Sequence, residues 1–372
     1  MIEQRWISVA RFNRVVAVYQ ALPGPEATEL CCYFGLLAGG RAGALVAGLA
    51  FLLPGFVLMT LIAWAYTTYG QASPAVVGAM ATVQVAVTAM VFRAVHKIGG
   101  DNIKDHTRAG EISMGLALCA ALAAAESTMN INFFLTLLHC ATLWAFCLQP
   151  RRTAAAVLWG AGPLLAAVIF VATTGRQFTD LVPLGTGAGS MGQNAGTIFV
   201  VGLLGGLLTF GGAYTAIPFI NYEAVIAGGW LTSQQFLDAI AFGQVIPSPL
   251  VMFVCFVGYA SGGLLGALLM TIGMFLPAFS FTLIGHEYFE RLVEAKGTVA
   301  HLLDGVSAAV AGLIAVTAIQ LLKAAVVKPV DAVVFSASLA ILYTSTHRYT
   351  APMLIAAAVL VGFILVAPQQ GR

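Results

Sequence analysis

The chain contains two copies of one apolar unit. The first copy reads Trp6-Ile7-Ser8 and then Gln20-x-x-Pro23-Gly24-Pro25; the second, 224 residues later, reads Trp230-Leu231-Thr232 and then Gln244-x-x-Pro247-Ser248-Pro249. The match continues at an offset of 223, where Gly35, Gly39, Gly40, Gly43 and Pro54 correspond to Gly258, Gly262, Gly263, Gly266 and Pro277. A duplicated apolar unit interrupted by glycine and proline is typical of secondary transporters, in which broken helices from two repeats meet near the bilayer midplane and form the substrate site.

The composition indicates a protein that lies almost entirely within a membrane. Of 372 residues, 60% are hydrophobic and 9% are charged, whereas a soluble domain carries about 25% charged residues. The sequence divides into about twelve apolar runs, including 12–37, 42–66 and 75–92, and several are shorter than the ~20 residues of a full span. We therefore expect an all-α polytopic membrane protein of about twelve helical segments, with an N-terminal repeat in residues 1–180 and a C-terminal repeat in residues 181–372.

Basic residues between the runs indicate how the repeats cross the membrane. Four of them are expected in a cytoplasmic loop after the run 75–92, by the excess of positive charge: Arg93, Lys97, Lys104 and Arg108. Seven predicted spans separate Pro54 from Pro277. Because this number is odd, the two copies would run in opposite directions, as inverted-topology repeats do.

Four segments of the chain resemble the chromate ion transporter family. They are Arg5-Trp6-Ile7-Ser8-x-Ala10-Arg11-Phe12, Leu22-Pro23-Gly24-Pro25-Glu26-Ala27, Phe210-Gly211-Gly212 and Phe275-Leu276-Pro277. The resemblance covers nearly the whole chain and includes the duplication. It implies a multi-pass carrier of the bacterial inner membrane that exports chromate by alternating access, gives chromate resistance and needs no cofactor. Sulfate, another tetrahedral dianion, is the alternative substrate.

Two features depart from the family pattern. Each family half opens with a helix that carries Phe-Gly-Gly-Pro. The second copy has Ala213 in place of that proline, and the first copy would need the motif before Met1. The chain therefore looks one transmembrane helix short, which indicates a start assigned too late or a reduced member of the family. The other departure is Ser248, which stands where the first copy has Gly24.

The two Pro-x-Pro elements are the main candidates for the substrate site. Proline lacks a backbone donor and disfavours helix in the residue before it, so two prolines one residue apart end one helical segment and begin another. The new half-helix presents N–H groups and the positive end of the helix dipole, which attract an anion. We predict a dianion between the half-helix starts at Pro25 and Pro249; a kink without a ligand is the alternative. The predicted substrate-binding residues are Arg11, Gln20, Pro23, Gly24, Pro25, Phe210, Gly211, Gly212, Gln244, Pro247, Ser248 and Pro249.

Arg11 and Arg14 lie three residues apart and would share one face of a helix. The planar guanidinium fork of Arg11 suits a tetrahedral oxyanion, and Arg11 belongs to the Ala-Arg-Phe motif of the family. Arg14 corresponds to Asp238 in the second copy, so these two residues are candidates for an ion pair across the pseudo-axis. Anchoring at the membrane interface is the alternative for both arginines.

Glu26 is the candidate for coupling transport to protons. It follows Pro25 directly, in the first turn of the predicted half-helix, and its counterpart in the second copy is Leu250. A carboxylate beside an anion site would repel the anion when charged and admit it when protonated. Helix capping or pairing with an arginine is the alternative for Glu26 and for the nearby Glu29.

Several other interpretations receive less support. The six cysteines lie in apolar runs without C-x-x-C spacing, which predicts neither a disulfide nor a metal site. The net charge of +2 argues against a nucleic-acid partner. The sequence has no Gly-x-Ser-x-Gly, His-Glu-x-x-His or P-loop motif, so an enzyme is not expected.

The rivals to a carrier are a passive channel and a non-transporting remnant. The expected partners are chromate or sulfate, the lipid bilayer and, as an open question, a second copy in a homodimer. The small-residue motifs Gly39-x-x-x-Gly43 and Gly262-x-x-x-Gly266 predict close packing of helices and no chemistry.

Overall fold

The computed structural model describes residues 15, 19, 24–69, 74–102, 113–129, 131, 133–148, 153–174, 192–209, 213–285, 298–345, 347 and 349–366. Within these ranges every regular element is a helix, and twelve of them are α-helices. The expected all-α, polytopic fold is confirmed. The division of the chain near residue 180 stays a prediction.

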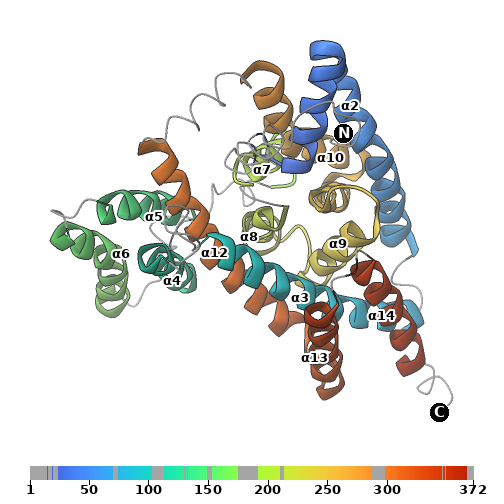
Figure 1. Ribbon diagram of the computed structural model, residues 1–372. Coiled ribbons are helices and arrows are strands. Elements are labelled where there is room, and N and C mark those ends of the chain that lie inside the picture. The colour runs from blue at the N-terminus through green and yellow to red at the C-terminus, as the bar shows by residue number, and fades with distance from the viewer. Residues whose placement is uncertain are drawn as a thin grey trace.

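The helices follow one another along the chain, joined in places by short 3₁₀ and π-helical turns (Figure 1). The N-terminal half holds α2 (Glu26–Tyr69), α3 (Pro74–Asn102), α4 (Met114–Thr128), α5 (Phe133–Cys147) and α6 (Thr153–Thr174). The C-terminal half holds α7 (Ala195–Leu207), η4 (Ala213–Thr215), α8 (Ala216–Asn221), η5 (Tyr222–Ala227), α9 (Ser233–Val245), η6 (Leu250–Met252), α10 (Phe253–Ser280), η7 (Phe281–Gly285), α12 (Thr298–Ala325), α13 (Pro329–Thr344) and α14 (Thr350–Val366).

The helices α2 and α10 are each folded into a hairpin at a pair of glycines. Gly39 and Gly40 have φ/ψ of −148°/27° and 63°/−154°, and Gly262 and Gly263 have −151°/25° and 61°/−151°. The second glycine of each pair occupies a region that side chains other than glycine rarely enter. The duplication is therefore present in the backbone itself, with nearly equal dihedral angles at equivalent positions.

Each hairpin brings two glycines of the repeat face to face. A Cβ atom added to Gly35 would clash with the carbonyl of Gly43, and one added to Gly258 would clash with the carbonyl of Gly266. The close approach predicted at Gly43 and Gly266 is thus found, but it joins the two arms of one hairpin. The residues before each turn, 26–38 and 250–261, are here called the first and second half-helix, and those after it, 41–69 and 264–280, the first and second return helix.

The two hairpins run in opposite directions. Ser248 lies against Gly55, and seven residues later Cys255 contacts Phe56 and Thr60, so the second half-helix runs in the same direction as the first return helix. Each half-helix is antiparallel to its own return helix. The two return helices therefore run antiparallel to each other, which agrees with the inverted repeat expected from the count of spans.

The repeats also exchange partners in the rest of the molecule. The long helix α3 packs against α13 and α14, whereas its counterpart α12 packs against α4 and α5. Close glycine contacts mark both interfaces, because Gly362 of α14 lies on Ala79 and Gly312 of α12 lies on Ala120. Figure 1 shows α3 and α12 running between the α4–α6 group on one side and α13 and α14 on the other. Each half of the protein is therefore completed by helices of the other half.

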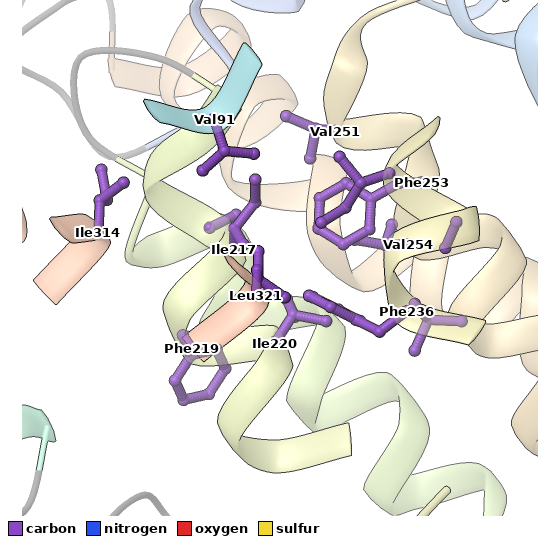
Figure 2. Close-up of a cluster of buried hydrophobic side chains, with 14 of the residues drawn as sticks. Val91, Ile217, Phe219, Ile220, Phe236, Val251, Phe253, Val254, Ile314 and Leu321 are labelled. Carbon is purple, nitrogen blue, oxygen red and sulfur yellow. The ribbon is translucent and has the colours of Figure 1, made fainter. Parts of the chain in front are cut away.

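The hydrophobic core lies where the two long helices meet the broken helices of the second copy. Figure 2 shows Val91 of α3 and Leu321 of α12 beside the α8 side chains, with Phe236 and Phe253 across from them. Each of these hydrophobic side chains is at most 1% exposed. This packing holds the short α8 and α9 segments at the centre of the molecule, where a short helix alone would be marginally stable.

Four described stretches are long and apolar enough to cross a membrane: Glu26–Tyr69, Gly78–Gly100, Leu250–Gly285 and Asp304–Ala325. The second of them corrects the loop expected after residue 92. Helix α3 continues to Asn102, so Arg93 and Lys97 are helical residues, whereas Lys104 and Arg108 lie outside the described residues. The helix continues because Val95 and Ile98 still pack against the core, and long basic side chains can extend from such a helix.

Candidate substrate site

Both Pro-x-Pro elements begin a helix, as predicted. Glu26 is the first residue of α2 and follows Pro25 directly, and Leu250 opens η6 directly after Pro249. The first helical hydrogen bonds run from Thr28 N to Pro25 O at 2.9 Å and from Met252 N to Pro249 O at 2.8 Å. Each half-helix therefore has its N-terminal, electropositive end at the proline.

The central residue of each Pro-x-Pro element lies against the return helix of the other copy. A Cβ atom on Gly24 would lie 3.4 Å from Cα of Ala278, and one on Gly55 would clash with the side chain of Ser248. Gly55 and Ala278 each follow the proline of a return helix, Pro54 or Pro277, and are equivalent in the duplication. The two breaks are thus held together by a reciprocal pair of contacts.

These contacts also account for the serine in the second element. The first contact pairs Gly24 with Ala278, and the second pairs Ser248 with Gly55. In both pairs one partner has a Cβ atom and the other is a glycine, and the second contact has room for a single Cβ, because one added to Gly55 would clash with Ser248. Ser248 fits at the second break because its partner has no side chain.

The break after α7 joins the same region. Gly24 N donates a hydrogen bond to Thr209 O at 2.8 Å, so the first Pro-x-Pro element is attached to the residue before Phe210. On the far side of that break, Tyr214 Oη accepts a hydrogen bond from Gln244 Nε2 at 2.7 Å. The turn η4 also packs against η6. Three interruptions of helices, at Gly24, at Leu208–Thr209 and at Ser248, therefore converge.

The packing of the hairpins places these interruptions at one depth. Gly35 and Gly43 face each other across the first hairpin. At the rise of an α-helix, Gly24 lies about 17 Å from Gly35 along the first half-helix, and Gly55 lies about 18 Å from Gly43 along the first return helix. Helix α7 runs parallel to the second return helix, with Gly202 on Met270 and Gly206 on Met274. At that register the end of α7 reaches the level of Pro277 and Ala278. We call this layer of breaks the central layer; it is the candidate substrate site.

The central layer contains buried polar groups without protein partners. The hydroxyl of Ser248, that of Thr28 and both carboxylate oxygens of Glu29 have no hydrogen-bond partner among the residues that the structure describes. Arg93 of α3 lies close enough to Tyr214 to act electrostatically on its hydroxyl group. Arg93 forms no ion pair with a carboxylate in the described part of the chain. Donors and a half-buried cation at one depth are what an oxyanion requires.

Asp238, a proposed partner of Arg14, is buried in α9 and forms hydrogen bonds with other residues. Its Oδ2 accepts from Tyr66 Oη at 2.7 Å, and its Oδ1 accepts from Gln84 Nε2 at 2.9 Å. Both oxygens of the carboxylate are thus bonded by neutral donors from α2 and α3. Arg14 lies outside the described residues, so its pairing with Asp238 stays a prediction.

Several other predicted site residues also fall outside the described ranges: Arg11, Gln20, Pro23, Phe210, Gly211 and Gly212. The described members Gly24, Pro25, Ser248 and Pro249 form the two breaks, and Gln244 joins them to the α7 break. Pro247 precedes Ser248 at the exposed end of α9. Glu26 is half-buried at the start of α2 and has an interaction partner.

The sequence was also compared with known proteins. The family profile described as "Chromate transporter" matches residues 1–145 and 196–363. The chain belongs to the chromate transporter family. The resemblance seen in the Pro-Gly-Pro and Phe-Gly-Gly motifs is thereby confirmed, and both Pro-x-Pro breaks lie within the matched residues.

Within this family, a chromate transport protein of Pseudomonas aeruginosa is 42% identical over 99% of this chain and 86% of its own length. A chromate transport protein of Cupriavidus metallidurans is 29% identical over 97% of this chain and 84% of its own length. A probable chromate transport protein of Synechococcus elongatus is 26% identical over 84% of this chain and 75% of its own length. No solved structure gives a significant match.

The structure brings four further residues to the candidate site that the sequence motifs did not indicate. They are Gly55, Ala278, Arg93 and Glu29. Gly55 and Ala278 are signalled only by their places after Pro54 and Pro277. The sequence predicted a loop at Arg93, because this charged residue follows an apolar run. Glu29 follows Pro25 by four residues, and only the tertiary packing shows that its carboxyl group is buried.

Proposed function

We propose that the protein transports chromate across the bacterial inner membrane, as an exporter that works by alternating access. The observation that supports this most is the convergence of three helix interruptions from two inverted repeats in one layer. In secondary transporters such a layer is the substrate site, since broken helices provide backbone donors at the bilayer midplane. Chromate is proposed as the substrate because the relatives are named chromate transport proteins.

The half-helix starts are the proposed binding groups for the dianion. The dipoles at Pro25 and Pro249 favour negative charge, and Ser248 adds a hydroxyl donor that is free of protein partners among the described residues. Arg93 from the described part, and Arg11 from outside it, are the proposed cations. Gln244 and Gln20 are proposed to hold the flanking segments, as Gln244 does through Tyr214.

Alternating access would follow from the reciprocal contacts. Each break rests on the return helix of the other copy, so a rocking of one hairpin against the other would change both half-helix starts together. Glu26 at the first half-helix start remains the proposed coupling residue from sequence. Sulfate has the same tetrahedral shape and charge as chromate and is the second candidate substrate; a channel or a remnant without transport remains an outcome of the test.

The test is uptake of radiolabelled chromate into everted membrane vesicles that contain the full chain. A carrier should saturate with chromate concentration, and excess sulfate should compete if both dianions share the site. Pro249→Ala should extend helix into the break and lower the flux by about tenfold or more at unchanged protein level. Flux that rises linearly without saturation would indicate a channel, and no flux above empty vesicles would indicate a remnant.

Arg93→Gln should weaken chromate uptake, and Arg93→Lys should restore it only in part, because lysine lacks the bidentate fork. Lys97→Gln, one turn further along α3, is the matched control and removes an equal charge from an exposed position. Equal uptake by wild type and Arg93→Gln would remove Arg93 from the site.

A further inference from the structure

The carboxyl group of Glu29 lies at the first helix break. Glu29 belongs to the second turn of the first half-helix, and its side chain folds back toward the start of that helix. Its Oε1 atom lies 2.5 Å from the point where a Cβ atom on Gly24 would stand, and its Cδ atom lies 3.0 Å from the same point. The absence of a side chain at Gly24 therefore leaves the space that the carboxyl group approaches.

Glu29 is fully buried, and its carboxyl group has no hydrogen-bond partner among the described residues. Its exposed fraction is 0%, and neither carboxylate oxygen has a hydrogen-bond partner in the described ranges. A buried carboxylate is normally paired with a cation or held by donors, because an isolated charge away from water is costly. The second copy has no equivalent acid, since Met252 and Phe253 stand at the matching positions. A buried acid that occurs in one copy only, with no hydrogen-bond partner among the described residues, points to a role in the site.

We propose that Glu29 is a proton-operated gate at the first half-helix start. The ionised carboxylate excludes the dianion from the central layer. The protonated carboxyl admits the dianion and donates a hydrogen bond to one of its oxygens. This inference rests on the proposed function and adds a residue to it, beside the coupling role proposed for Glu26.

The surroundings of Glu29 favour such a role. The titratable groups that act on it or are acted on by it are Glu26 and Cys32 of the same half-helix and Tyr19 of the preceding segment. The other elements at this point contribute Thr209 and Ala278, which do not titrate. None of these described groups is a cation that could neutralise the carboxylate. Among these groups only a proton can neutralise the carboxylate, and Glu26 adds to the repulsion of a second negative charge.

The proposal predicts a defined link between binding and pH. Repulsion between a carboxylate and a dianion in contact within a protein lowers affinity by roughly a thousandfold or more. Only the protonated form then binds, so each dianion takes up one proton. Above the titration midpoint of Glu29, the apparent Kd should rise by about tenfold for each pH unit. Affinity is thus full at low pH and is lost as the pH rises.

The experiment measures proton uptake when chromate binds to the full chain in lipid nanodiscs. A pH-indicator dye in weakly buffered solution reports protons, and radiolabelled chromate reports binding. Sulfate serves as a second probe because, unlike chromate, it does not itself take up protons near neutral pH. In the pH range where the Kd of wild type rises, above the titration midpoint of Glu29, wild type should take up about one proton per dianion more than Glu29→Gln, and the Kd of the variant should stay level between about pH 6 and about pH 9.

Two variants make the result specific. Glu126→Gln changes another glutamate with 0% exposure, in α4; it alters the contact with His139, but its proton uptake on binding and the pH dependence of its Kd should equal those of wild type. Glu29→Asp keeps the carboxyl but withdraws it from Gly24, so its Kd should depend less steeply on pH than that of wild type. Glu29→Asp also tests the proposal if Glu29→Gln does not fold. A Glu29→Asp protein whose Kd depends on pH as steeply as that of wild type would overturn the gate.

The outcomes separate this inference from the proposed function. If wild type binds neither dianion, the proposed function fails. If wild type binds but Glu29→Gln takes up as many protons, the gate is refuted while the function stands. If Glu26→Gln removes the proton and Glu29→Gln does not, the coupling belongs to Glu26 alone.

Discussion

Gly55→Ala should destabilise the protein, because the added methyl group would clash with one side chain, that of Ser248. A Cβ atom on Gly55 would stand 2.8 Å from Oγ of Ser248 and closer still to its Cβ. Carbon atoms in contact are normally about 3.5–4.0 Å apart, so the break would have to move by about 1 Å. Overpacking of this kind costs about 1–3 kcal/mol.

Removing the Ser248 side chain should reverse the effect. In a Gly55→Ala, Ser248→Gly double variant the nearest remaining atom is Cε of Met252 at 3.6 Å, which is an ordinary contact. The second contact would then have the same composition as the first, an alanine on the return helix and a glycine in the Pro-x-Pro element. The two substitutions should therefore show a coupling free energy of about 1–3 kcal/mol.

The assay is thermal unfolding of the purified protein in detergent, followed by size-exclusion chromatography of the heated samples. Gly55→Ala alone should lower the apparent Tm by roughly 2 °C for each kcal/mol, and the double variant should recover it. Gly99→Ala is the matched control, because no atom lies within 4 Å of its Cβ position. A Gly55→Ala protein as stable as wild type, or a double variant no better than the single one, would refute the reciprocal packing.

Three further predictions concern other parts of the fold. His139→Leu should destabilise the protein by about 3–5 kcal/mol, because it leaves the buried carboxylate of Glu126 without the His139 Nδ1 contact. The Glu126→Leu, His139→Leu double variant should recover stability in the same thermal assay, and a double variant less stable than the single one would contradict the pairing. Gly263→Ala should cost about 1–3 kcal/mol because its φ of 61° and ψ of −151° suit only glycine, and a Tm equal to that of Gly99→Ala would argue against the hairpin turn. Tyr214→Phe leaves Gln244 Nε2 without its acceptor; it should lower chromate uptake by weakening the contact between the α7 break and α9, and unchanged uptake would show that this hydrogen bond does not order the site.

The sequence alone determined the class of the protein and the positions of its breaks. With 60% hydrophobic residues, the chain has too few charged groups to cover a surface in water. The composition alone therefore indicates a membrane protein. The helix starts after Pro25 and Pro249 were predictable because proline acts on its own backbone and on the residue before it. The opposite direction of the two copies followed from counting spans, and the family from the motifs around those prolines.

The tertiary structure decided which residues meet at the breaks. Gly24 meets Ala278 and Ser248 meets Gly55, although the members of each pair lie far apart in the chain, and no local pattern specifies such contacts. The glycine pairs at 39–40 and 262–263 read as helix-packing motifs, but they form turns because each half-helix must fold back along its return helix. Arg93 and Glu29 likewise carry charges that a sequence assigns to loops or caps. Burial is a property of the neighbours that a side chain acquires, so only the packed helices show that Arg93 is helical and that Glu29 is enclosed beside the first break.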